Sequence, residues 1–371
     1  MSASLSGNSV LDRFRGCLLG GAAGDALGGP VEFLSRDEIR RRFGAKGIGS
    51  FAPAYGRAGA ITDDTQMTLF TAEGLLRGRV RFLDEGIEDY TTATARAYQR
   101  WLLTQGDARV SGEFERLDTG WLYGQEALHS RRGPGNICLS SLRRISTPAG
   151  RANNDSKGCG GVMRVAPVGL FAWSLRKEWT AGDAFQLGTD LAALTHGHST
   201  GSLTGGVQAV LVLRLLDGAS LKEALSVAKD GLRERADHRE TLVAIEQAEE
   251  LADAGLSHDE AIDRLGQGWI AEEALAISIY CALVAETFRE GVILAVNHDG
   301  DSDSTGAITG NLLGAVHGVG AISAEWLEGL ELRDVIAEVA DDLYGFPDWD
   351  IGSDAADRGA REKILAKYPG S

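Results

Sequence analysis

The chain contains the stretch Asn297-His298-Asp299-Gly300-Asp301-Ser302-Asp303-Ser304-Thr305-Gly306, which leads directly into an apolar segment, Ala307–Val316. Three carboxylates stand on alternate positions, and such a run of hard oxygen atoms is typical of a divalent-cation site. The spacing is similar to that of an EF-hand loop, but such a loop needs a glutamate at its twelfth position. That position is Leu312 when the count begins at Asp301, and Gly310 when it begins at Asp299. A metal bound here therefore needs further ligands from elsewhere in the chain.

The composition is that of a globular protein. The chain has 371 residues, of which 43% are apolar and 24% charged, so it is able to bury a large core in one large domain or two ordinary ones. Its formal net charge of -16 opposes broad contact with nucleic-acid phosphates or an anionic membrane. We therefore expect no general nucleic-acid binding and no membrane association.

Cysteine usage and the N-terminal residues bear on the compartment. The four cysteines, Cys17, Cys138, Cys159 and Cys281, are scattered without a C-x-x-C pair, which indicates neither a zinc knuckle nor a disulfide framework. The first residues, Met1–Asn8, lack the basic and apolar regions of a signal peptide, and no later run reaches the ~18 apolar residues of a membrane span. A cytoplasmic location is the expectation.

Helical signals begin near the N-terminus. Ser9 followed by Asp12 predicts a capping box, with apolar residues at helical spacing after it. The run Gly20–Pro30 is rich in small residues, which allow another helix or a ligand to approach closely. The sequence Thr62-Asp63-Asp64-Thr65 introduces a second helical segment, and Tyr90–Leu103 forms a third.

The remainder of the chain also predicts helices. Residues 133–161 form a long loop with a short helix near Leu139, and residues 168–345 contain no proline. Amphipathic segments in this last part lie near residues 184–194, 205–216, 221–232, 242–254 and 272–288. Strand-like alternation occurs only around Arg79–Phe82. We therefore predict an all-α protein with one compact domain over residues 1–371.

Two acidic helix starts have both a structural and a functional explanation. Thr62-Asp63-Asp64 alone is explained by helix capping, since an N-terminal threonine and early acidic residues satisfy free N–H groups. The run at Asp301–Ser304 also precedes a helix, but its alternating carboxylates repel one another and exceed what capping needs. If the two helices converge, they can share a metal, since Mg²⁺ is held by a few carboxylates with waters and substrate oxygens.

Other candidate residues leave alternatives open. The turn Gly158-Cys159-Gly160-Gly161, preceded by Lys157, either presents N–H groups to a phosphate or is an ordinary tight turn, and it matches no Walker A motif. His196 and His198 point in divergent directions on a helix, so one faces a ligand at most. Of the carboxylates Asp25 and Glu32, one approaches a substrate and the other caps or pairs.

Five motifs, taken in order, resemble the ADP-ribosylglycohydrolase family over nearly the whole chain. They are G-D-A-L-G-G-P-V-E from Gly24, T-D-D-T from Thr62, S-K-G-C-G-G-V-M-R-V-A-P from Ser156, T-H-G-H from Thr195 and H-D-G-D-S-D-S from His298. The sequence departs from the family pattern at Cys159, where well-known members carry Asn or Ser, and at Ser304, which replaces a frequent Thr. These departures affect nucleotide contacts and metal affinity.

The resemblance implies an all-α fold with orthogonal helices and two Mg²⁺ or Mn²⁺ ions. The implied metal ligands are Thr62, Asp63, Asp64, Asp301, Asp303 and Ser304. It also implies that the Gly158–Gly161 turn, with Lys157 before it, binds the diphosphate of ADP-ribose, and that His196 lies beside the nucleotide. Glu32 matches a glutamate that lies near the scissile bond in the family.

The resemblance therefore implies a hydrolase that releases ADP-ribose from an acceptor, such as an ADP-ribosylated arginine side chain or a small molecule. We expect catalytic roles for Glu32, Asp63 and Asp303, which orient water or protonate the leaving group. The alternative is an ADP-ribose-binding or immunity-type protein without turnover. A purely structural helical protein remains as a third possibility.

Overall fold

Helices make up nearly all the regular structure of the computed structural model, which describes residues 9–107, 118–145, 150–352 and 357–370. The α-helices are α1 (Val10–Gly28), α2 (Arg36–Phe43), α3 (Asp63–Glu85), α4 (Tyr90–Thr104), α5 (Asn136–Arg144), α6 (Ala166–Ser174), α7 (Ala181–Ala193), α8 (Ser199–Leu216), α9 (Leu221–Arg233), α10 (Arg239–Asp253), α11 (His258–Leu265), α12 (Ala271–Val284), α13 (Phe288–Val296), α14 (Ser302–His317), α15 (Ala324–Gly329), α16 (Arg333–Gly345) and α17 (Arg358–Lys367). Short 3-10 helices are η1 (Glu126–Leu128), η2 (Cys159–Gly161), η3 (Val319–Ala321) and η4 (Phe346–Asp348). Two strands, β1 (Pro53–Ala54) and β2 (Arg57–Ala58), pair antiparallel. The all-α prediction is confirmed.

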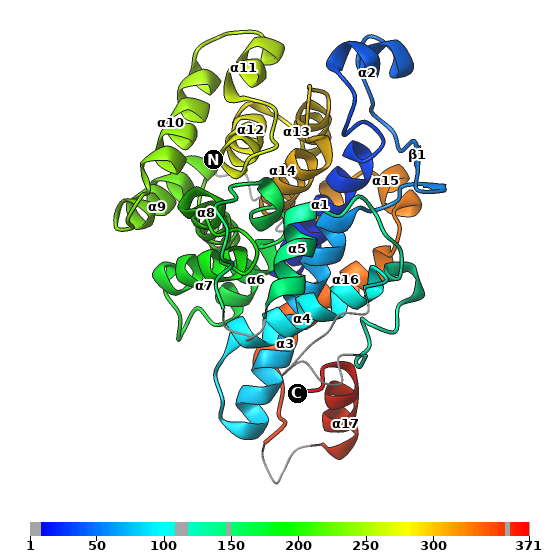
Figure 1. Cartoon of the computed structure of the whole chain (residues 1–371), viewed down its shortest axis with the longest axis vertical. Coiled ribbons are helices and arrows are strands. Elements are labelled where there is room, and N and C mark those ends of the chain that lie inside the picture. The colour runs from blue at the N-terminus through cyan, green and yellow to red at the C-terminus, as the bar shows by residue number, and fades with distance from the viewer. Residues whose placement is uncertain (1–8, 108–117, 146–149, 353–356, 371) are drawn as a thin grey trace, which may run out of the picture.

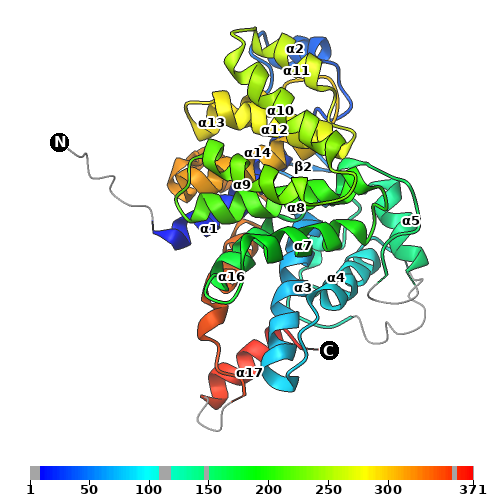
Figure 2. The ribbon, with the colours of Figure 1, turned by 90° about the vertical axis from the view of Figure 1, so that its left-hand side faces the viewer.

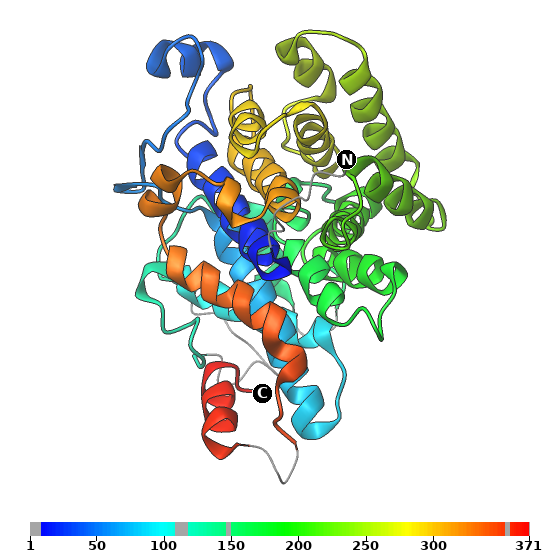
Figure 3. The same ribbon diagram turned by 180° about the vertical axis from the view of Figure 1, so that it is seen from behind.

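A pair of antiparallel helices, α1 and α14, lies at the centre of the molecule (Figure 3). Their contact is made by glycines that recur every four residues on each helix. A Cβ atom at Gly16, Gly20 or Gly24 would lie 2.4, 2.5 or 2.0 Å from the carbonyl oxygens of Gly314, Gly310 and Gly306, in that order. Only glycine permits this approach, so the small-residue run at Gly20–Pro30 serves to admit another helix.

The other helices surround this pair. Helices α12 and α13 pack on α14, and α16 packs on α1, while α3 pairs with α4 and α7 with α8 (Figures 1 and 2). The apolar side chains of these helices form one continuous buried cluster. None of the helices in the described ranges combines the length and the hydropathy that a membrane crossing requires.

Several local predictions can be compared with the helices. The Ser9 capping box is present, and Asp12 N–H donates to Ser9 Oγ at 3.2 Å. The alternation at Arg79–Phe82 does not form a strand, because these residues continue α3, whose first four turns are buried on every side. The predicted segment 272–288 is two helices, since α12 ends at Val284 and Thr287 caps the start of α13. The prediction about Met1–Asn8 concerns residues outside the described ranges.

We predict that Gly24→Ala lowers the free energy of unfolding by about 3 kcal/mol or more, because its methyl group would overlap the backbone of α14. Urea unfolding followed by circular dichroism measures the change. The control is Gly231→Ala in α9, where a Cβ would meet its nearest atom at an ordinary 3.6 Å. There we expect no loss and up to about 1 kcal/mol of gain, since alanine is the better helix former. Equal stabilities of the two variants would contradict the tight contact.

Candidate active site

The start of α14 carries the first half of the site. Asp301 is the N-cap residue, and its carboxylate accepts the N–H of Ser304 at 3.3 Å. Its own N–H donates to Gln267 O at 2.8 Å, and the preceding Gly300 has a φ of 131° that favours glycine. The capping explanation is thus correct for Asp301. The carboxylates of Asp301 and Asp303 also line a cavity.

The start of α3 carries the second half. Thr62 is the N-cap residue and accepts the Asp64 N–H at 3.3 Å. Asp63 is held by the neighbouring loop, because its N–H donates to Arg132 O at 3.0 Å and its Oδ2 accepts the Gly135 N–H at 3.3 Å. Capping and orientation of the acidic side chains are therefore achieved together.

Asp25, near the end of α1, caps α3 from outside. Its carboxylate accepts the N–H of Thr62 at 3.0 Å and the N–H of Thr65 at 3.1 Å, and the Thr65 hydroxyl also donates to it. Burial raises the pKa of Asp25 to about 6, while these hydrogen bonds lower it. Asp25 therefore caps a helix and does not approach a substrate. Its hydrogen bonds also link α3 to α1.

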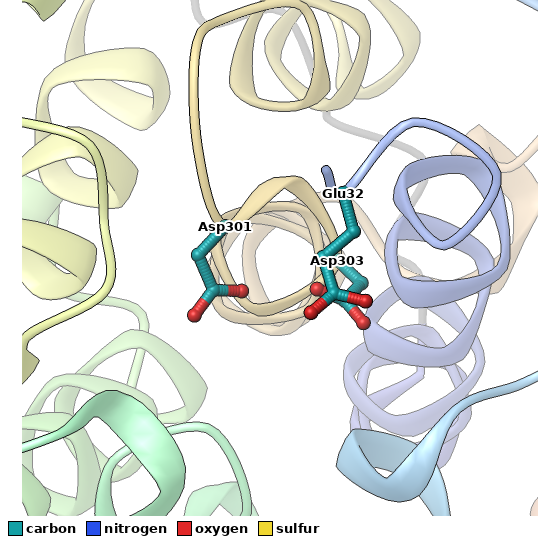
Figure 4. A group of neighbouring side chains, drawn as sticks. All are labelled: Glu32, Asp301 and Asp303. Atoms are coloured by element: carbon teal, nitrogen blue, oxygen red, sulfur yellow. The ribbon is translucent and has the colours of Figure 1, made fainter. Parts of the chain in front are cut away.

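Glu32 follows α1 and meets the start of α14. One carboxylate oxygen from each of Glu32, Asp301 and Asp303 lies within 4.8 Å of the others, and Figure 4 shows the three side chains converging. These residues line a cavity of about 200 Å³ together with Asp63 and Asp64. A Cβ at Gly133 would lie 3.8 Å from Glu32 Oε2 and 3.9 Å from Asp63 Oδ1, so both oxygens border the same small space. The two predicted halves do converge.

The close carboxylates shift one another's protonation. Burial raises the pKa of Glu32 to about 9, with the charges of Asp301 and Asp63 adding to the effect. Burial raises the pKa of Asp63 to about 8, and it raises the pKa of Asp64 and Asp303 well above the usual value. No Lys or Arg is among the described residues that line the cavity. These carboxylates therefore lack a positively charged side chain as a partner among the described residues that line the cavity.

One buried oxygen atom makes the case for a cation. Asp64 is 3% exposed, and its Oδ1 has no hydrogen-bond partner among the described residues. A buried carboxylate oxygen without a partner is costly, and oxygen-rich, acidic sites of this kind suit Mg²⁺ or Mn²⁺. The residues present therefore fit a divalent cation. Ser304 also lines the cavity, whereas Thr62 is buried beside it with its hydroxyl 3.4 Å from Asp64 Oδ2.

The predicted phosphate turn forms η2 on another wall of the cavity. Gly158 N–H donates to Ser156 Oγ at 3.3 Å and Cys159 N–H to Trp269 O at 3.3 Å. The Lys157 side chain is directed elsewhere, since it pairs with Glu240 and Glu272 and is absent from the cavity lining. Two of the turn's donors and the lysine are thus engaged inside the protein.

His196 packs against this turn. A Cβ at Gly160 would lie 3.0 Å from its Cε1, and its Nδ1 lies 2.9 Å from the Thr195 hydroxyl. Burial, reinforced by the charge of Arg164, lowers the pKa of His196 to about 3, so the ring is neutral at physiological pH. His198 instead caps α8, and its Nδ1 accepts the Thr200 N–H at 3.1 Å. One of the two imidazoles faces the cavity, as expected.

The sequence reasoning gave no site role to two neighbours of the site. Tyr55, at the β1–β2 turn, has its hydroxyl beside Gly133, and burial and the charge of Glu32 raise its pKa. Trp269 lines the cavity and stacks on Phe33, with ring centroids 5.7 Å apart. Cys159 was predicted as part of the phosphate turn, but the contact of its Sγ with Asp301 Oδ2, at 2.7 Å, was not.

We predict opposite effects of Asp64→Asn without and with metal. In chelator, the variant is expected to raise the melting temperature by about 1–3 °C, because it removes a buried charge among other carboxylates. Saturating Mg²⁺ or Mn²⁺ should then stabilise the native chain more than the variant, which has lost a ligand. Differential scanning calorimetry measures both, with the exposed Asp253→Asn as control. The same metal-induced rise in all three proteins would rule out a metal role for Asp64.

A family model described as ADP-ribosylglycohydrolase matches residues 6–350 of this chain. The chain is 32% identical over 348 residues to an uncharacterized protein of Archaeoglobus fulgidus, with 90% of this chain and 96% of the relative covered. It is 27% identical to the ADP-ribosylarginine hydrolase Tri1 of Pseudomonas putida, with 92% and 81% covered. A solved structure described as an ADP-ribosylglycohydrolase-related protein complex has 27% identity and a TM-score of 0.65, with 90% and 98% covered.

The family match and the structural similarity agree, and the family match extends over the parts of the chain that carry the two helix starts. The chain therefore belongs to the ADP-ribosylglycohydrolase family and is a hydrolase of that family.

Proposed function

We propose that the protein hydrolyses the glycosidic bond between C1″ of ADP-ribose and an arginine side chain, and that it needs two Mg²⁺ or Mn²⁺ ions. The proposed metal ligands are Thr62, Asp63, Asp64, Asp301, Asp303 and Ser304. The observation that carries this proposal is the convergence of the acidic starts of α3 and α14 on one cavity, where the buried Asp64 Oδ1 has no partner among the described residues.

The bound ions would polarise the ribose hydroxyl groups and the attacking water. The protein's own residues orient the reactants. Asp63 has one oxygen engaged by the Gly135 N–H, while its Oδ1 borders the space beside Gly133 and is available to accept a hydrogen bond from water. Asp303 holds the opposite side, next to Glu32. This division suits the expected roles of Asp63 and Asp303 in positioning the water.

Glu32 is the proposed proton donor to the departing nitrogen. Burial is the largest cause of its raised pKa, which is about 9 without bound metal, and burial favours the protonated carboxyl group that a proton donor needs. Glu32 lies on the short segment after α1 and is only partly buried, so it is able to reach substrate from the open side of the cavity. Its place beside Asp303 puts acid and water-positioning groups close together.

The nucleotide is proposed to lie along η2. In the Gly158–Gly161 turn, the N–H group of Gly160, which lines the cavity, is the proposed donor to the diphosphate, and neutral His196 packs against the same turn. Lys157 supports the turn through its backbone, because its carbonyl oxygen accepts the Ala271 N–H at 2.8 Å. We therefore assign Lys157 an anchoring role rather than a phosphate contact.

Aromatic surface beside the cavity favours a cationic acceptor. Trp269 lines the cavity and stacks on the exposed Phe33. A guanidinium group is attracted to aromatic faces. The similarity to an ADP-ribosylarginine hydrolase supports the same acceptor.

We predict that Asp303→Asn and Asp63→Asn each lower metal-dependent release of ADP-ribose from an ADP-ribosylated arginine peptide by at least about 100-fold, the order typical of a lost ligand-shell contact. The physical reason is the loss of a charged metal ligand that also positions water. Release is measured by chromatography with Mg²⁺, with Mn²⁺ and with chelator.

The matched control is Asp299→Asn in the same acidic run. Asp299 accepts the backbone N–H of Arg36 at the start of α2 and does not line the cavity, so activity should be retained. Full activity in folded Asp303→Asn would contradict the mechanism. Calorimetric binding of ADP-ribose without turnover of any substrate would instead favour the non-hydrolytic alternative.

A panel of substrates tests the acceptor. We expect release from ADP-ribosyl-arginine to exceed release from serine-linked and phosphate-linked ADP-ribose at equal concentration by about tenfold or more, which corresponds to ~1.4 kcal/mol of preferential binding. The kcat/KM of each substrate is the measurement. A faster serine-linked reaction would contradict the assignment of arginine as the acceptor.

A further inference from the structure

Cys159 stands at the metal-facing edge of the cavity although it belongs to the proposed phosphate turn. Its Sγ atom is 2.7 Å from Asp301 Oδ2 and 3.7 Å from Ser304 Oγ. Both oxygen atoms belong to proposed metal ligands. Cys159 as a residue is partly exposed and lines the cavity. Its sulfur atom is thus placed among hard oxygen donors.

These distances can be compared with those around a metal ion. Two ligands on one tetrahedral zinc, with Zn–S near 2.3 Å and Zn–O near 2.1 Å, are separated by ~3.6 Å. Ser304 Oγ is already at that separation from Cys159 Sγ, and Asp301 Oδ2 needs to move by less than ~1 Å. The geometry is within the range of small side-chain rotations.

A second, independent observation points to a cation here. Asp64 is 3% exposed and lines the same cavity. Its Oδ1 atom has no hydrogen-bond partner among the described residues. Two thiols, Cys138 and Cys159, are among the described lining residues, and Cys159 is the one that contacts Asp301 and Ser304. Carboxylates and hydroxyls suit Mg²⁺ or Mn²⁺, whereas a thiolate selects softer ions such as Zn²⁺ or Cd²⁺.

We propose that Cys159 makes this centre a binding site for a thiophilic divalent cation, with Zn²⁺ or Cd²⁺ held by Cys159 Sγ together with the carboxylate of Asp301. As the metal–sulfur bond forms, the thiol proton passes to solvent and no oxidation occurs. This inference rests on the proposed function only in placing metal ligands at Asp301 and Ser304.

The consequence is competition between two kinds of ion for one site. The ion held through sulfur occupies the carboxylate that an oxygen-bound Mg²⁺ or Mn²⁺ ion would use. It also ties the phosphate turn to the start of α14, across the space that a ribose would enter. Zn²⁺ is therefore expected to inhibit the hydrolase at concentrations far below those at which Mg²⁺ supports it.

The test titrates Cd²⁺ into the metal-free full chain and follows the ultraviolet absorption of a cadmium–thiolate bond, a readout that needs no substrate. We expect the native chain to develop this absorption with one equivalent of Cd²⁺, and Cys159→Ser to lack it. Cys138→Ser, which removes the other thiol among the described lining residues, is the matched control and should keep it. Zn²⁺ affinity, measured by competition with a chromogenic chelator, should fall by about tenfold or more in Cys159→Ser.

A folding defect is separated from loss of the sulfur ligand by the Mg²⁺-induced rise in melting temperature, which Cys159→Ser should retain. Absorption that persists in Cys159→Ser, or that is absent from the native chain, overturns the inference. A chain that shows the Cys159-dependent absorption but hydrolyses no substrate contradicts the proposed function alone. An active hydrolase without that absorption contradicts this inference alone.

Discussion

The backbone contact between α1 and α14 is the constraint on which the site depends. Because glycines recur every four residues on both helices, the axes approach until carbonyl oxygens replace side chains as the contact surface. The helices are antiparallel, so the end of α1 lies beside the start of α14, and a Cβ at Gly28 would touch Ser302 O. Asp25 and Glu32 are thereby brought to the acidic run although they are far away in sequence.

The carboxylates are tolerated because two helices begin at the site. The starts of α3 and α14 direct the positive ends of their dipoles toward the cavity, which partly offsets repulsion among Asp63, Asp301 and Asp303. Capping engages some carboxylate oxygens and leaves others, such as Asp64 Oδ1, without a partner among the described residues. Without bound cations, the buried like charges destabilise the fold, whereas cations that bind to them stabilise it.

The sequence predicted the helices because their apolar residues recur at a regular spacing. It predicted the two acidic helix starts because one has more carboxylates than capping needs and the other repeats the same kind of capping pattern. Capping and cation binding were weighed as rival explanations, yet the side chains at Asp301 and Thr62 do cap their helices while the neighbouring carboxylates face the cavity. Contacts between distant segments could not be predicted this way. The pairing of Lys157 with Glu240 and Glu272, and the approach of Cys159 to Asp301, depend on how separate loops pack and leave no periodic trace.

The glycine contact also has a consequence for biosynthesis. Helix α1 leaves the ribosome roughly 280 residues before its partner α14, a delay on the order of tens of seconds at ~5–20 residues per second. During that interval the glycine face of α1 has no surface to pack against, and glycine-rich segments hold a helix poorly on their own. The contact between α1 and α14 can therefore form only after most of the chain between them has been synthesised, so the centre of the fold closes late and through long-range contacts.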